Sequence, residues 1–109
     1  MDTNLKMKSK RTKACEITPE VRQKVEERDG GKCIFCFKPG RGEAHFVKRS
    51  QGGLGIETNI VTACRWCHHQ MDDGFYRDVY IQRAQDYLKE KYPDWKLSDQ
   101  IYHKGFEYD

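Results

Sequence analysis

The stretch from residue 33 to residue 67 reads CIFCFKPGRGEAHFVKRSQGGLGIETNIVTACRWC and decides the fold. It begins and ends on a Cys-x-x-Cys pair, Cys33 with Cys36 and Cys64 with Cys67. Two such pairs can present four thiolates tetrahedrally around one Zn²⁺, each pair chelating through a tight turn. The segment between the pairs is longer than a minimal zinc ribbon needs. We therefore expect a structural zinc site with an additional element folded between its two halves.

Other uses of these cysteines fit the chain less well. A redox Cys-x-x-Cys needs only one pair and a βαβ setting, disulfides need an oxidising compartment, and buried cysteines without a metal are a third interpretation. The chain starts with a basic, polar stretch and has neither an apolar signal segment nor an apolar run long enough to span a membrane. We therefore expect a cytoplasmic protein with reduced cysteines and no membrane partner. The remaining cysteine, Cys15, is expected to be a free thiol without a role.

Length and composition allow one small domain. Of 109 residues, 37% are hydrophobic and 34% are charged, so the core is thin and gains from a bound metal. We expect residues 1–15 to form a disordered basic tail and residues 16–109 to form a single domain. Its core is expected at 17–73, with a C-terminal helical extension over 74–109.

The local pattern predicts an α+β fold. Thr18 and Pro19 are typical of a helix N-terminus, and this helix should end near Asp29, because Gly30 follows it. The other expected elements are strands within residues 43–49 and 59–63 and helices over residues 64–73 and about 75–91. The chain is thus expected to hold a β-hairpin between two zinc-binding turns, followed by helices.

The hairpin and the helix after it carry a second group of polar residues. His45 lies on the first expected strand, and Asn59 opens the second. His68 and Asp72 are four residues apart, so they share one face of the expected helix and can hold a divalent cation. A neutral His45 in the same cleft could take a proton from water near neutral pH. Together these residue types can perform metal-assisted hydrolysis, although each alone has an ordinary structural explanation.

The cysteine pairs and these polar residues together resemble the sequence pattern of the HNH endonucleases, in particular zinc-containing members encoded by phages. The resemblance covers about residues 17–73, and the stretch from Tyr87 to Tyr102 is similar to the C-terminal extension of such phage proteins. The motifs that carry it are the two cysteine pairs, Ala44-His45-Phe46, Ser50-Gln51-Gly52-Gly53, Asn59-Ile60-Val61 and His68 directly after Cys67. It implies the small ββα-metal fold, also called the His-Me finger.

The resemblance also implies an activity and residue roles. His45 would be the general base, and Asn59 would fix the connecting loop and orient His45 through hydrogen bonding. His68 and Asp72 would bind a catalytic Mg²⁺, Mn²⁺ or similar cation, while zinc braces the hairpin against the helix. The implied reaction is hydrolysis of DNA phosphodiester bonds. One departure is Ala44, where many members have an Asp or His metal ligand.

The residue at position 44 leaves several outcomes open. Asp72, His68 and water can suffice as ligands, Glu43 or His69 can contribute, or activity is weak or lost. The main alternative function is therefore a non-catalytic zinc-ribbon module that binds nucleic acid, and a protein-interaction zinc finger is a third.

DNA is the expected partner, with phage packaging proteins as a further candidate. The net charge is +3, and the basic residues gather in the tail and centre of the chain, which suits a phosphate backbone. We expect Lys48, Arg49 and Arg65 to contact phosphates, although such residues are often only solvated. Trp66 is expected in the core rather than as a base-stacking platform. The choice between monomer and homodimer stays open.

Overall fold

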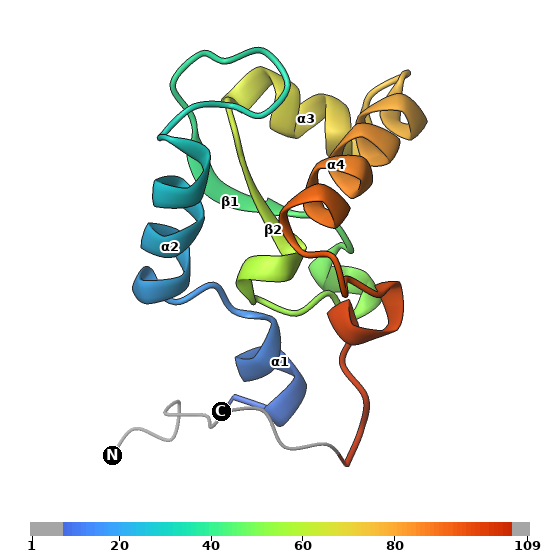
Figure 1. The fold of residues 1–109 in the computed structure, drawn as a ribbon. Helices are drawn as coiled ribbons and strands as arrows, with labels where there is room; N and C mark the ends of the chain where they lie inside the picture. The colour runs from blue at the N-terminus through green and yellow to red at the C-terminus, as the bar shows by residue number, and fades with distance from the viewer. Residues whose placement is uncertain (1–7, 106–109) are drawn as a thin grey trace, which may run out of the picture.

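The computed structural model describes residues 8–105, and Figure 1 shows how its elements are arranged. The protein has an α+β fold in which a two-stranded sheet is surrounded by helices. Helix α2 packs against both strands, and α3 packs against β2 and α4. None of the helices in residues 8–105 is long and apolar enough to cross a membrane.

The sheet is a hairpin of β1 (Arg41–His45) and β2 (Ile60–Ala63), which run antiparallel. Ala44 is paired with Val61 and His45 with Ile60. Strand β1 starts and ends earlier than the sequence pattern predicted. It ends at His45 because, just beyond it, the backbone N–H and C=O of Val47 both bond to the side chain of Asn59 instead of to a strand.

The expected start and end signals of helix α2 (Pro19–Asp29) are confirmed. The Thr18 hydroxyl accepts a hydrogen bond from the N–H of Val21 at 3.2 Å, which caps the helix N-terminus. Gly30 ends the helix with a φ of 69°, a left-handed conformation that glycine adopts without strain.

Helix α3 (Arg65–Asp73) grows directly out of the second cysteine pair. Cys64 is its N-cap, and its sulfur accepts a hydrogen bond from the N–H of Cys67 at 3.4 Å. Cys67 and Met71 are buried four residues apart. One face of α3 therefore packs on the core, and the other faces of the helix point away from it. The helix predicted over 64–73 is thereby confirmed to within one residue.

The C-terminal part of the chain covers the hairpin. Helix α4 (Arg77–Lys91) buries Ala84 and Leu88. After it, Trp95 packs edge-on against Phe46 at a centroid distance of 5.5 Å, and its indole N–H donates to the Thr58 carbonyl at 2.7 Å. The short 3₁₀ helices are η1 (Arg49–Gln51), η2 (Glu57–Asn59) and η3 (Leu97–Gln100). The C-terminal extension is thus part of the same core as the hairpin.

A buried charge pair ties α2 to β2 and α4. The Arg28 guanidinium donates two hydrogen bonds to the Asp29 carboxylate, at 2.7 and 2.9 Å. The Asp29 carboxylate also accepts from the N–H of Thr62 and from the Tyr87 hydroxyl. These bonds lower the pKa of Asp29 even though burial acts to raise it, with Arg28 the strongest opposing influence. The Asp29 carboxylate is therefore charged, and its hydrogen bonds connect α2 with β2 and α4.

The structure differs from the expected disordered tail from residue 10 onwards. Residues Lys10–Cys15 form helix α1, capped by the Ser9 hydroxyl. Cys15 is 3% exposed, and the Ala14 carbonyl accepts a hydrogen bond from the N–H of Gly55 at 2.9 Å. This segment is ordered because it packs on the glycine-rich loop between the strands, a contact between distant parts of the chain. Residues 1–7 lie outside the described part of the protein.

Candidate functional site

The two cysteine pairs form one cluster. The first pair lies in the loop before β1 and the second where β2 meets α3, so folding the hairpin brings them together. All four sulfurs lie within 4.8 Å of one another, and the Sγ atoms of Cys36 and Cys64 are 3.6 Å apart. Within residues 8–105 this is the only group of three or more histidine, cysteine or acidic residues gathered so closely. The structure thus confirms a four-cysteine cluster that could hold a metal ion.

Two backbone amides donate hydrogen bonds to sulfurs of this cluster, which favours the thiolate form of those cysteines. The N–H of Phe35 donates to Cys33 Sγ at 3.4 Å, as the N–H of Cys67 does to Cys64 Sγ. Burial acts to raise the pKa of Cys64, but the Cys67 amide and the neighbouring thiols lower it to about 7. Burial and the same neighbouring thiols raise the pKa of Cys67. Soft thiolate ligands in this number suit zinc. The residues present therefore fit a structural zinc ion.

Phe37 is unusual in the turn after the first pair. Its φ is 66°, a left-handed conformation that costs a non-glycine residue about 1–2 kcal/mol. The conformation lets the N–H of Phe37 donate to the Cys33 carbonyl at 2.9 Å, which closes the turn around the cluster. The Phe37 side chain gains no burial in return, because it is 72% exposed.

A cavity of about 490 Å³ lies between the hairpin and α3. His45 of β1 and His68 and Asp72 of α3 all line this cavity, together with Lys48 and Arg49 just after the strand. The sequence placed these side chains in one cleft, and the structure brings them together. Its other charged lining residues are Arg22, Glu43 and Asp73. The cavity thus combines two imidazoles with three carboxylates and three basic side chains, so it offers groups for both a cation and an anion.

His45 is held by a backbone carbonyl that no motif or pattern in the sequence indicated. Its Nε2 lies 3.0 Å from the carbonyl oxygen of Cys15. A carbonyl only accepts, so the ring proton is on Nε2 and Nδ1 is the basic nitrogen. Burial lowers the pKa of His45, the Cys15 carbonyl opposes this, and Arg49 lowers it further. His45 is therefore a neutral imidazole at neutral pH and can accept a proton.

Asn59 closes the loop between the strands. Its side-chain oxygen accepts from the N–H of Val47 at 2.9 Å, and its amide group donates to the carbonyls of Val47 and Leu54 at 3.2 and 2.9 Å. This is the loop-fixing role that the resemblance implied. Direct orientation of His45 by Asn59 is not what the structure shows, because these bonds occupy the Asn59 amide and the carbonyl of Cys15 holds the His45 ring.

His68 and Asp72 form a pair that can bind a cation. Their Nε2 and Oδ2 atoms are 3.3 Å apart. Two ligands on one octahedral cation with bonds of about 2.1 Å lie about 3 Å apart, so the pair needs little adjustment. Glu43 lines the same cavity, while Ala44 is fully buried in the core. Of the groups considered as replacements for a ligand at position 44, Glu43 is thus on the cavity wall.

A second cavity of about 570 Å³ adjoins the first, because Glu43, His68 and Asp72 line both. Arg65 and His69 line only this second cavity. The expected phosphate contacts are therefore divided, with Lys48 and Arg49 on one side of the His68–Asp72 pair and Arg65 on the other. Lys48 also lies 3.6 Å from Asp73, which joins the hairpin to α3.

Trp66 does not lie in the core, as the sequence had led us to expect. It is 67% exposed. On a helix, consecutive residues point about 100° apart, so burying Cys67 and Met71 turns the neighbouring Trp66 outward.

Comparisons with protein-family models, with curated proteins and with solved structures find no significant match for this chain. The likeness to HNH nucleases therefore depends on the motifs and on the geometry described above. Two features stand independently of any likeness, namely the four-cysteine cluster and the cavity that His45 shares with His68 and Asp72.

Proposed function

We propose that this protein is a zinc-stabilised endonuclease that hydrolyses DNA phosphodiester bonds in the cavity between β1 and α3. The observation that supports it most is the common cavity that His45, His68, Asp72, Lys48 and Arg49 line. A neutral base, a pair that could hold a cation and basic side chains that could hold a phosphate would then surround one space. Zinc in the four-cysteine cluster would hold the hairpin against α3.

In the proposed reaction, His45 acts as general base. Its Nδ1 takes a proton from the attacking water, while the Cys15 carbonyl keeps the opposite ring nitrogen protonated. Arg49 and Lys48 hold the phosphate that is attacked. His68 and Asp72, with Glu43 beside them, would hold a divalent cation. When bound, that cation would supply stabilisation of negative charge on the phosphate and the leaving oxygen.

One observation favours a second candidate function, a zinc module that binds nucleic acid without cutting it. Ala44 offers no ligand atom and is buried in the core. The cation would then depend on His68, Asp72 and Glu43, and Glu43 is already engaged, with Arg22 Nε at 3.2 Å and Arg41 Nη1 at 3.9 Å. The two functions differ in whether phosphodiester bonds break.

A plasmid-nicking assay separates the two functions. Zinc-loaded protein is incubated with supercoiled plasmid and Mg²⁺, Mn²⁺ or Ni²⁺, and open-circular product is quantified. We expect wild type to nick and His45→Ala to lose at least 100-fold of the rate, since general-base catalysis contributes about 10²–10⁴-fold. His103→Ala, an exposed histidine near the C-terminus, is the matched control and should nick like wild type. Equal rates for wild type and His45→Ala would refute the proposal.

A further inference from the structure

Two large aromatic side chains are exposed beside the four-cysteine cluster. Phe37 is 72% exposed and Trp66 is 67% exposed. Phe37 directly follows Cys36 and Trp66 directly precedes Cys67, two of the four cysteines whose sulfurs lie within 4.8 Å of one another. Both residues therefore lie next to the cysteine cluster in the chain, and both rings are exposed. Packing within the protein therefore does not explain why an aromatic residue stands at either position. Phe37 also adopts a left-handed backbone conformation.

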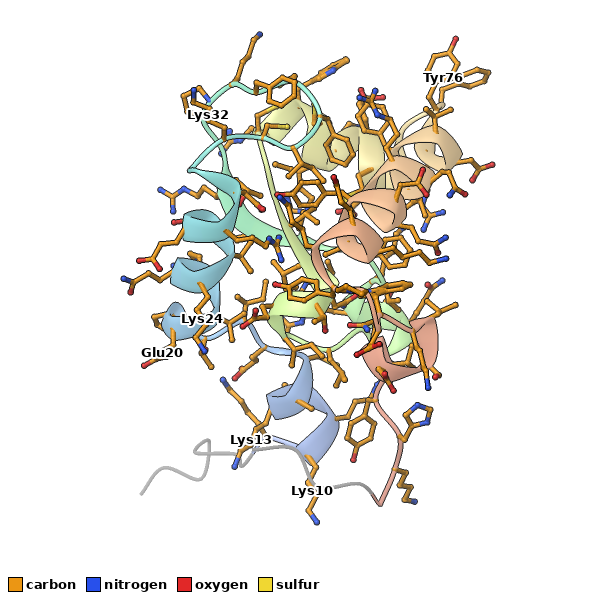
Figure 2. All side chains as sticks on the ribbon, viewed as in Figure 1. Lys10, Lys13, Glu20, Lys24, Lys32 and Tyr76 are labelled. Atoms are coloured by element: carbon orange, nitrogen blue, oxygen red, sulfur yellow. The ribbon has the colours of Figure 1, made fainter. Side chains whose placement is uncertain are left out.

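The same surface is basic. Four exposed basic side chains lie on the segments that carry the cysteine pairs, and residues 31–42 and 60–71 contain no acidic residue. We call the six residues the knuckle surface, namely Lys32, Phe37, Lys38, Arg41, Arg65 and Trp66. Figure 2 labels Lys32 at the end of the molecule formed by the first cysteine turn and α3, opposite to Lys10 and Lys13 of α1. Arg41 has an acidic neighbour in Glu43, at 3.9 Å.

Exposed aromatic rings among basic side chains are suited to binding an unpaired nucleic-acid strand. Phosphates complement the positive charge, and flat bases stack on aromatic rings. In duplex DNA the bases are already stacked inside the helix, so only an unpaired strand offers both groups at once. An acidic protein segment would satisfy the charge but has no need for two exposed flat rings beside it.

We propose that the knuckle surface binds an unpaired DNA strand, with bases stacked on Phe37 and Trp66 and phosphates held by the four basic side chains. Arg41 and Arg65 also line the second cavity, which adjoins the cavity of His45. The strand can therefore continue from the knuckle surface towards the proposed nuclease site. Binding at this surface requires no cleavage, so it can be tested whether or not the nuclease proposal holds.

The two tryptophans make binding directly measurable. Trp95 is 9% exposed while Trp66 is 67% exposed, so stacking on Trp66 should quench part of the intrinsic fluorescence. The zinc-loaded full chain is titrated with a single-stranded dT 12-mer and with a 12-base-pair duplex, without Mg²⁺ or Mn²⁺. We expect saturable quenching by the single strand and tighter binding of it than of the duplex.

Substitutions assign the binding to the knuckle surface. Affinity of each variant is measured by anisotropy of a labelled dT 12-mer, with zinc content as the test of folding. Trp66→Ala and Phe37→Ala should each weaken binding by about tenfold, the loss expected for one stacked base. Lys38→Gln and Arg65→Gln should each lower the slope of log K against log salt concentration by about 0.7. Leu97→Ala and Lys89→Gln, exposed residues elsewhere, are the matched controls and should bind like wild type.

The outcomes are decisive in both directions. Tighter binding of the single strand than of the duplex, weakened in zinc-loaded Trp66→Ala and Phe37→Ala by anisotropy, supports the proposal even if the nicking assay fails. Duplex binding equal to single-strand binding, zinc-loaded aromatic variants with wild-type affinity, or no binding of either oligonucleotide would overturn it. The last result would favour a protein as the occupant of this surface.

Discussion

The loop between the strands depends on one side chain, and replacing Asn59 by alanine tests how much. The side chain is fully buried and makes three hydrogen bonds, to the N–H of Val47 and to the carbonyls of Val47 and Leu54. In Asn59→Ala all three backbone groups lose their partner inside the protein. Each lost bond costs about 1 kcal/mol, and more where the group stays dry. We expect Asn59→Ala to lower the free energy of unfolding by about 3 kcal/mol.

Equilibrium urea unfolding of zinc-loaded protein, followed by circular dichroism, measures this loss. For a domain of about 100 residues, 1 kcal/mol corresponds to a shift of about 4–8 °C in Tm, so thermal unfolding should show a fall of more than 10 °C. Asn59→Asp is the informative companion. A carboxylate can accept from Val47 but cannot donate to the two carbonyls, so it should be at least as destabilising as alanine.

The activity of the same variants separates stability from catalysis. Asn59→Ala should nick poorly, because β1 ends on His45 where the Asn59 side chain takes over the backbone bonds. His45→Ala should lose nicking but keep most of its stability. A fall of less than 1 kcal/mol for Asn59→Ala would show that this amide does not hold the loop, and our account of the hairpin would be wrong.

Three further outcomes are expected. Removing zinc with a chelator, or replacing Cys64 by serine, should abolish the folded circular dichroism signal, because metal binding and folding are coupled in small zinc domains; a full signal without metal would contradict this. His68→Ala should stop nicking while the unfolding midpoint stays near that of wild type, and loss of both would mark His68 as structural. Asp29 has a pKa below its ordinary value of 3.8. Its contribution to stability is therefore complete above pH 3.8 and is lost as the pH falls through the lowered pKa. Asp29→Asn should thus make the free energy of unfolding, measured with urea, less dependent on pH on the acid side.

Local signals explain what could be predicted from the sequence. The helix from Pro19 to Asp29 was predictable because its cap, its proline and its terminal glycine act within one turn of the chain. The four-cysteine cluster was predictable because the spacing within each pair is itself the chelating geometry. The exposure of Trp66 could have been inferred as well, since burying the adjacent Cys67 directs it away from the core.

Features that depend on distant contacts could not be predicted. Helix α1 is polar and short, and its order comes from burial of Cys15 and from the bond between Ala14 and Gly55 on the glycine-rich loop. No sequence signal marks a backbone carbonyl as the partner of a histidine, because every residue has one. The end of β1 likewise depends on Asn59, which is far along the chain from Val47.

The carbonyl of Cys15 has a practical consequence for how this protein is shortened or fused. Motif matching alone would trim the chain at residue 17, just past the atom that fixes the tautomer of His45. A version trimmed there keeps every residue of the HNH-like pattern. In it, however, no Cys15 carbonyl determines which ring nitrogen of His45 carries the proton. Anyone engineering this scaffold should therefore keep the first helix together with the cavity that His45 lines.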